Sequence, residues 1–252
     1  MSKKIALCLS GHLRDGDKTS YPRLKEIILD KYDCDIFVSS WDINAFGGDN
    51  FNFSPTYSEK QSEADIITRI IDTYNPKKYN IESGKPEWLS SLEKKWNNLR
   101  LGAGHHPYPH VSPMLAMFRK IENANDLRCE YQQQTGVVYD LVIRFRFDAA
   151  PEYDFIEKNK HLWENNKTVC FGPYSNFGFN DILFFGDPDI MTLAARCFSN
   201  TPVREDNLRD FRNGEEVLRK FIESNNIPHT LTRDINFYAN FRAESMNAHW
   251  VP

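Results

Sequence analysis

The fold is decided at the N-terminus, where residues 4–40 read KIALCLSGHLRDGDKTSYPRLKEIILDKYDCDIFVSS. The continuous apolar run Ile5–Leu9, which ends at a Ser-Gly break, is typical of a strand buried on both faces. Residues 22–31 carry apolar side chains at helical spacing and predict a helix. Asp35–Ser40 predicts a second strand. A β–α–β opening of this kind predicts a parallel pair of strands with a right-handed crossover.

Apolar periodicity predicts further elements along the chain. Helices are expected at 61–74, 86–100, 113–134 (with Ser112 as N-cap), 188–198 and 214–224. Strands are expected at 78–81, 139–147, 169–171, 182–185 and 230–232. Loops are expected at 44–58 and 102–110, and a tail at 235–252. The sequence therefore predicts a single α/β domain over 1–252, with a mostly parallel central sheet flanked by helices and a less regular C-terminal half.

Composition narrows the class of protein. The 252 residues include 31 Lys and Arg against 35 Asp and Glu, a net charge of −4 that argues against a general nucleic-acid binder. The mean hydropathy of −0.58 and 40% hydrophobic content predict a soluble globular protein without a membrane span. The five cysteines form no CxxC pair, and no signal peptide is evident, so a reduced, cytoplasmic protein is expected.

Ligands of open α/β sheets bind at the carboxyl ends of the strands, so the residues that follow each strand are candidates for a site. The first predicted strand is followed by a turn that offers backbone N–H groups and a guanidinium to an anion, formed by Ser10, Gly11, His12 and Arg14. An ordinary turn with a surface arginine is the alternative. After the second strand, Trp41 could stack on a base and Asp42 could accept a hydrogen bond from a sugar hydroxyl. Gly186 and Asp187 follow the strand predicted at 182–185.

The run Arg144-Phe145-Arg146-Phe147-Asp148 ends the strongest predicted strand. Because side chains alternate along a strand, the two arginines and the aspartate are expected on one face and the two phenylalanines in the core. Burying these charges unpaired is expensive. Two interpretations stay open: a buried ion-pair network that closes the end of the sheet, or a diphosphate site in which Asp148 holds a divalent cation or a sugar hydroxyl.

Three carboxylates are candidates for a general base. Asp181 lies in the stretch NFGFND before a predicted strand, where Asn180 is a candidate acceptor contact and a capping turn is the alternative. Glu215 and Glu216 open a predicted helix, where carboxylates are ordinary partners of the helix dipole.

The loop at 102–110 contains His105, His106 and His110. Without cysteine spacing these histidines do not predict a zinc site, so contact of His106 or His110 with the acceptor is the preferred interpretation. Trp41 and the loop residues Phe46, Phe51 and Phe53 are the aromatic side chains expected around a ligand.

The chain lacks the GxGxxG and GxxxxGK[ST] motifs of Rossmann dehydrogenases and P-loop kinases. The stretches KIALCLSGHLRD, DCDIFVSSWD, YDLVIRFRFDAAP and NDILFFGDPDIM, spread over residues 4–191, instead resemble nucleotide-sugar glycosyltransferases of the GT-A type. Within that type the similarity is to a group found in capsule and surface-glycan loci and in large viruses. The resemblance implies a GT-A-like domain with a nucleotide-binding half at about 1–148 and an acceptor-binding half at about 149–252.

Many GT-A enzymes carry an Asp-x-Asp motif that binds a divalent metal and the sugar diphosphate. The matching stretch here is Arg146-Phe147-Asp148, in which arginine replaces the first carboxylate. The resemblance therefore leaves two possibilities, Mn or Mg at Asp148 or a metal-independent mechanism in which Arg144 and Arg146 neutralise the leaving diphosphate. By the same resemblance Ser10, Gly11 and Arg14 line the nucleotide site and Asp181 faces the acceptor.

Together these features predict a hexosyl- or pentosyltransferase that moves a sugar from a nucleoside-diphosphate sugar to a hydroxyl of a glycan acceptor. Two alternatives remain. A sulfotransferase would also place an arginine after a strand, and a non-catalytic carbohydrate- or protein-binding module could use the aromatic loop. A homodimer is compatible with the aromatic content, which reaches 13%.

Overall fold

The computed structural model describes residues 3–42, 45–46, 56–57, 63–82, 111–172, 178–201, 211, 213–235 and 237–239. Its centre is a seven-stranded sheet in the order β10-β8-β9-β6-β1-β2-β5. The strands are β1 (Lys4–Gly11), β2 (Asp33–Trp41), β5 (Lys78–Glu82), β6 (Leu141–Arg146), β8 (Val169–Phe171), β9 (Leu183–Gly186) and β10 (His229–Leu231). All run in one direction except β9, which is antiparallel to both of its neighbours. The predicted α/β class with a mostly parallel sheet is confirmed.

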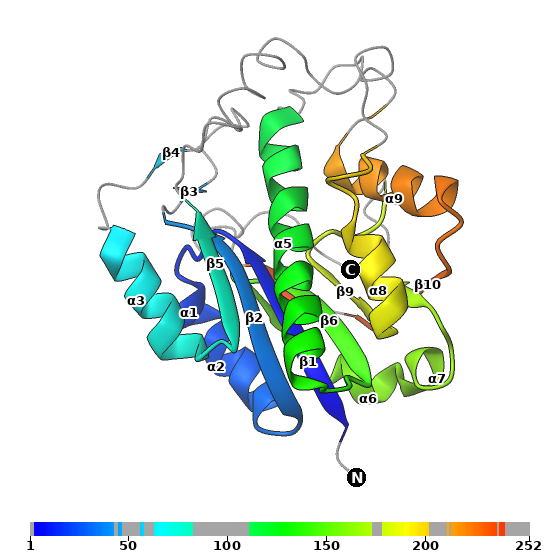
Figure 1. Cartoon of the computed structure of the whole chain (residues 1–252), viewed down its shortest axis with the longest axis horizontal. Coiled ribbons are helices and arrows are strands. Elements are labelled where there is room, and N and C mark those ends of the chain that lie inside the picture. The colour runs from blue at the N-terminus through cyan, green and yellow to red at the C-terminus, as the bar shows by residue number, and fades with distance from the viewer. Residues whose placement is uncertain are drawn as a thin grey trace, which may run out of the picture.

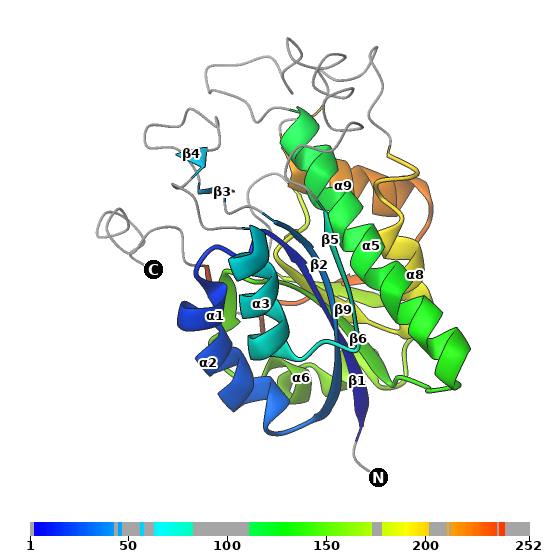
Figure 2. The ribbon, with the colours of Figure 1, turned by 60° about the vertical axis from the view of Figure 1, so that its left-hand side comes forward.

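Helices cover both faces of the sheet, as Figure 2 shows. One face carries α1 (Gly16–Thr19), α2 (Tyr21–Leu24), the π-helix η1 (Lys25–Leu29), α3 (Glu63–Tyr74), α6 (Phe155–Lys158) and α7 (Lys160–Trp163). The other carries the long helix α5 (Val111–Thr135), which crosses the sheet in Figure 1, with α8 (Pro188–Ala195) and α9 (Gly214–Ser224). Two short antiparallel pairs complete the described elements: β3 (Ala45–Phe46) with β4 (Thr56–Tyr57), and β7 (Ala149–Pro151) with β11 (Phe237–Ala239).

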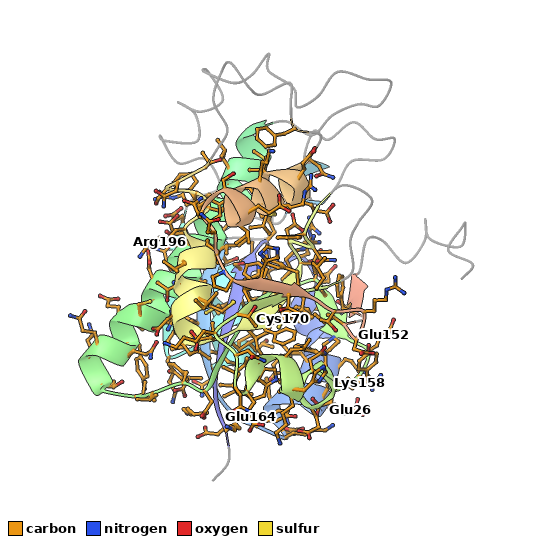
Figure 3. The ribbon with its side chains drawn as sticks, turned by 90° about the vertical axis from the view of Figure 1, so that its right-hand side faces the viewer. Glu26, Glu152, Lys158, Glu164, Cys170 and Arg196 are labelled. Carbon is orange, nitrogen blue, oxygen red and sulfur yellow. The ribbon has the colours of Figure 1, made fainter. Side chains whose placement is uncertain are left out.

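The two faces of β1 explain this layering. Ile5, Leu7 and Leu9 pack with α2, η1 and α3, whereas Ala6 and Cys8 pack under α5. Both sets are buried, so the strand is apolar on both sides, as expected for a strand inside a parallel sheet. All five cysteines are free thiols. Figure 3 shows Cys170, on β8, in the interior, and the charged Glu26, Glu152 and Glu164 at the periphery. None of the described helices is long and apolar enough to cross a membrane.

Most predicted elements lie where the sequence placed them. The short helices α1, α6 and α7 were not predicted, and the predicted loop 44–58 contains the paired strands β3 and β4. Three further differences concern predicted segments. The segment predicted as one helix at 22–31 is divided between α2 and a π-helical turn. Helix α5 begins at Val111, so Ser112 lies inside its first turn and is not the N-cap. The tail forms strand β11, which pairs with β7, and neither of these strands was predicted. The helix predicted at 86–100 lies outside the described residues.

Candidate functional site

The polar residues that follow the strands meet at one edge of the sheet. In the ladder, Ser10 near the end of β1 pairs with Arg146 at the end of β6 and with Ser39 on β2. Because β9 is antiparallel, its start lies at this same edge, and Arg146 N donates to Ile182 O at 3.1 Å. Asp181, which precedes β9, is thereby brought to the carboxyl ends of β1 and β6.

The direction of β9 also corrects one prediction. Gly186 pairs with Val169, the first residue of β8, so the residue after β9 lies at the opposite edge of the sheet. Asp187 there caps α8, and its Oδ1 accepts from the backbone N–H groups of Asp189 at 2.9 Å and Ile190 at 3.1 Å. Asp187 is a capping residue remote from the other candidates.

The turn after β1 holds its arginine in an unusual backbone conformation. Gly11 has φ of +109° and Arg14 has φ of +52°, values that L side chains adopt at a cost. Ser40 Oγ donates to Gly11 O at 2.8 Å, and Arg69 Nη2 on α3 donates to Arg14 O at 3.2 Å. Arg69 also forms an ion pair with Asp17 on α1. The turn is therefore held from β2 and from α3, which fixes where the Arg14 side chain starts.

Arg14, Arg144, Arg146 and Asp148 form what we call the arginine cluster. Arg146 binds Asp148 with two hydrogen bonds, Nε to Oδ1 at 2.8 Å and Nη2 to Oδ2 at 2.6 Å. Arg14 Nη1 donates to the same Oδ2. Asp148 is 3% exposed, so its carboxylate is enclosed by two guanidinium groups. The ion-pair interpretation of this region holds for these three residues.

The charges of the cluster shift one another's pKa values. Burial alone would raise the pKa of Asp148, but Arg146 and then Arg14 outweigh it and lower the pKa to about 2. Burial lowers the pKa of Arg14, which Asp148 only partly offsets. The pKa of Arg146 is raised, because its attraction to Asp148 exceeds the cost of burial. The carboxylate is thus ionised over the whole physiological range.

Arg144 is the exceptional member of the cluster. It is 2% exposed, and its Nε donates to Ser10 Oγ at 3.2 Å. Its Nη1 and Nη2 atoms are buried and have no hydrogen-bond partner within the described part of the chain. The guanidinium lies 5.9 Å from the centre of the Phe184 ring. Burial lowers the pKa of Arg144 to about 9, with partial compensation from Asp181. A buried cation with unmatched donors is the arrangement that an anionic ligand would complete.

Two of the predicted carboxylates lie beside this cluster. Asp181 acts electrostatically on both Arg144 and Arg146, and Glu215 acts on Arg146. The loop before β9 is packed tightly against the start of α9, since Phe179 N donates to Glu215 O at 3.1 Å. A Cβ on Gly214 would lie 3.7 Å from Asp181 Oδ2. Loop and helix therefore hold both carboxylates near the guanidinium groups.

The remaining predicted residues are placed as follows. Glu216 lies 3.7 Å from Arg219 along the same helix, and its backbone N–H is capped by Asn213. Asn180 uses its side-chain oxygen to accept from Ile182 N at 2.8 Å, so the residue that caps this turn is Asn180 and not Asp181, which the capping alternative named. His105, His106, His110, Phe51 and Phe53 lie outside the described residues, as does the side chain of Phe46.

A second group of buried charges was missed by the sequence analysis. Lys120 on α5 is fully buried, and its Nζ lies 3.1 Å from Glu82 Oε2 and 3.9 Å from the centre of the Trp41 ring. Arg119 Nη2 also donates to Glu82, at 3.1 Å. We call these four residues the lysine cluster. A lysine among the apolar positions of an amphipathic helix was the available signal.

The lysine cluster constrains the roles predicted for Trp41 and Asp42. Trp41 is 4% exposed and one face of its indole is covered by Lys120, while the His12 ring lies 6.2 Å away. One face of the Trp41 indole is therefore already occupied by Lys120 and is not available to a stacked base. Asp42 is 6% exposed and lowers the cost of the buried Lys120 charge, whose pKa burial nevertheless lowers to about 8.

A divalent cation at Asp148, one of the two possibilities that the sequence resemblance leaves open, does not fit this geometry. Both carboxylate oxygens already accept hydrogen bonds from guanidinium groups, and the position of the first Asp of the motif is Arg146. Mg²⁺ and Mn²⁺ require several oxygen ligands, and two neighbouring cations oppose a third. Over the described residues, no group of three or more His, Cys, Asp or Glu side chains is arranged to hold a metal.

The sequence matches no protein-family model and no curated protein. Among solved structures, a chain described as a nucleotide-diphospho-sugar transferase from Desulfovibrio desulfuricans G20 is 11% identical with a TM-score of 0.39, covering 92% of this chain and 80% of that one. Apo mouse xyloside xylosyltransferase 1 is 9% identical with a TM-score of 0.40, covering 92% and 84%.

Proposed function

We propose that the chain is a glycosyltransferase that moves a hexose or pentose from a nucleoside-diphosphate sugar to a hydroxyl of a glycan acceptor. The observation that carries this proposal is the unmatched, buried guanidinium of Arg144 beside Arg14 and Arg146, at the carboxyl ends of β1 and β6. Three guanidinium groups gathered at one point suit a polyanion such as a diphosphate. Asp181 and Glu215 next to them supply carboxylates suited to deprotonating a hydroxyl.

In the proposed reaction the acceptor oxygen forms a bond to the anomeric carbon while the bond from that carbon to the phosphate oxygen breaks. The acceptor proton goes to a carboxylate, with Asp181 the first candidate and Glu215 the second. The electron pair of the broken bond leaves with the nucleoside diphosphate, whose negative charge Arg144 and Arg146 stabilise. Ser10 orients Arg144 through its Oγ, and the turn at Gly11 brings Arg14 to the same point.

Calorimetric binding to a panel of UDP-, GDP-, CMP- and dTDP-compounds tests the proposal. We expect at least one of them to bind; binding by none would overturn it. Selective binding of adenosine 3′,5′-bisphosphate would instead identify a sulfotransferase. Binding of a glycan with no affinity for any nucleotide would identify a carbohydrate-binding module.

The role of Asp181 can be tested separately once a donor is known. We expect Asp181→Asn to lower kcat by about 10²- to 10⁴-fold with donor affinity retained, because the general base is removed while the cations remain. Glu223→Gln is the matched control, since Glu223 is an exposed carboxylate at the far end of the same helix α9 and should leave kcat unchanged. Glu216→Gln tests the third candidate in the same assay. Loss of kcat in Glu215→Gln with none in Asp181→Asn would transfer the role to Glu215.

A further inference from the structure

We propose that the donor diphosphate is bound without a divalent cation, by the guanidinium groups of Arg14, Arg144 and Arg146, and that Asp148 is the positioning carboxylate that holds two of them. The inference rests on the proposed function, because it concerns how that function's donor is held. It assigns Asp148 a role that differs from metal ligation.

The hydrogen bonds of Asp148 are the first argument. Its Oδ1 accepts from Arg146 Nε at 2.8 Å, and its Oδ2 accepts from Arg146 Nη2 at 2.6 Å and from Arg14 Nη1. A cation ligated by either oxygen would lie within a few ångströms of two guanidinium groups, and this repulsion opposes its binding in a buried site. The bidentate geometry fixes the plane of the Arg146 guanidinium, which leaves its remaining N–H groups in a defined direction.

The balance of charge is the second argument. Arg14 and Arg146 both form an ion pair with the buried Asp148, and Arg144 forms none with any of the residues that the structure describes. By hydrogen bonds and ion pairs, the cluster therefore sets three guanidinium groups against the one carboxylate of Asp148. Asp181 and Glu215 lie near enough to interact electrostatically with the guanidinium groups of the cluster. Neither accepts a hydrogen bond from Arg144 Nη1 or Nη2. A diphosphate brings both negative charge and the acceptor oxygens that these N–H groups lack.

A third observation lies on the neighbouring strand. Ser39 on β2 pairs in register with Ser10, and its Oγ is also buried without a hydrogen-bond partner in the described structure. Because registered residues of a parallel sheet point to the same face, Ser39, Ser10 and Arg146 form one polar row beneath α5. Arg144 lies on the same face, one pleat away. Unsatisfied donors on two strands of one face are expected where a polar ligand completes the site.

The decisive experiment compares metal conditions on the unmodified protein. Kd would be measured by calorimetry for UDP, GDP, dTDP and inorganic pyrophosphate, in EDTA, in Mg²⁺ and in Mn²⁺. We expect a nucleoside diphosphate to bind in EDTA with a Kd within about threefold of its value with either metal. Binding only with metal, or tightening by more than about tenfold on adding it, would overturn the inference and leave the proposed function standing. Absence of nucleotide binding under every condition would overturn both.

Two variants locate the binding on the cluster, again in EDTA. Arg146→Gln is expected to weaken the nucleoside diphosphate by about tenfold or more and the corresponding nucleoside by less than about twofold, since only the diphosphate loses a cation. Equal losses for both ligands would contradict the inference. Arg196→Gln is the matched control, because Arg196 forms its ion pairs with Glu122 and Asp126 on α5. Arg14→Gln serves if the Arg146 variant does not fold.

Asp148→Asn separates the two roles of the carboxylate by the sign of its effect. A metal ligand, once neutralised, would weaken diphosphate binding together with metal binding. A positioning carboxylate, once neutralised, loosens the two guanidinium groups but also removes a negative charge near the diphosphate; these effects oppose each other, so the Kd in EDTA should not rise by more than about threefold and Mn²⁺ should not change it. A rise of tenfold or more that excess Mn²⁺ reverses would count against the inference.

Discussion

The arginine cluster and the lysine cluster are two groups of buried cations at the same edge of the sheet. In the lysine cluster, Lys120 donates to Glu82 and its charge faces the Trp41 ring, while Arg119 and Asn123 also donate to Glu82. In the arginine cluster two guanidinium groups share Asp148, and Arg144 keeps two buried nitrogen atoms without an acceptor among the described residues.

This difference in hydrogen bonding indicates that Lys120 stabilises the fold, whereas Arg144 is placed to bind a ligand. Lys120 joins α5 to β5 and β2, and its interactions are made within the chain. It can also reduce the cost of its burial by losing a proton, since its pKa is already lowered to about 8. An arginine does so far less readily, even with a pKa lowered to about 9. At neutral pH Arg144 therefore stays charged and destabilises the fold by its burial, and a bound anion would remove this destabilisation.

Neutralising the central carboxylate of each cluster gives the largest expected effect. Asp148→Asn should lower the free energy of unfolding by about 3 kcal/mol or more, because two partly buried guanidinium groups lose their shared, buried counter-charge. Glu82→Gln should lower it by only about 1–2 kcal/mol, because Lys120 can deprotonate and Glu82 is more exposed. Urea unfolding at pH 7 measures both. Equal losses would contradict the distinction between the two clusters.

Replacing the cation itself should give a smaller effect of opposite sign. Arg144→Met should raise the free energy of unfolding by about 1–3 kcal/mol, because it removes a buried charge whose amino groups have no partner. It should also weaken binding of a nucleoside diphosphate. Lys120→Met should be neutral or destabilising, because it breaks a satisfied interaction with Glu82. Destabilisation by both substitutions would mean that Arg144 is paired as fully as Lys120.

The fold was largely predictable from local pattern. The β–α–β opening, α3, α5 and the strands β6 and β8 have apolar periodicities that need no tertiary information. The direction of β9 was not predictable, because a strand of four buried, mostly apolar residues has the same pattern whether it runs parallel or antiparallel to its neighbours. That single reversal brought Asp181 to the site and moved Asp187 away from it.

The sequence predicted which residues form the site better than it predicted which of their side chains bind one another. The alternation of Arg144, Arg146 and the phenylalanines correctly predicted which side chains share a face. Which guanidinium binds Asp148 depends on the left-handed backbone at Arg14 and on Arg69 of α3, a contact between residues 55 positions apart. Lys120 was missed because lysine is common in helices, and its burial against Glu82 depends on a contact between α5 and β5 that the local sequence does not show.

The smallest expected effect is in the pH dependence of the free energy of unfolding, which should differ between the two clusters. Lys120 has a pKa of about 8 in the fold against 10.5 in the unfolded chain, so the unfolded state binds more protons between these values and stability rises with pH there. Asp148 has a pKa of about 2 against 3.8, so its contribution is complete above about pH 4 and is lost as pH falls toward 2. In urea unfolding from pH 2 to 10, the stability difference between the parent protein and Lys120→Met should therefore grow with pH above about 8, and that between the parent and Asp148→Asn should shrink as pH falls toward 2. Comparing each variant with the parent cancels the contributions of Arg144, whose pKa is also lowered, and of the buried thiols of Cys8 and Cys170, whose pKa values are raised. If the difference between the parent and Lys120→Met stayed constant over the alkaline range, Lys120 would not be the group that titrates there.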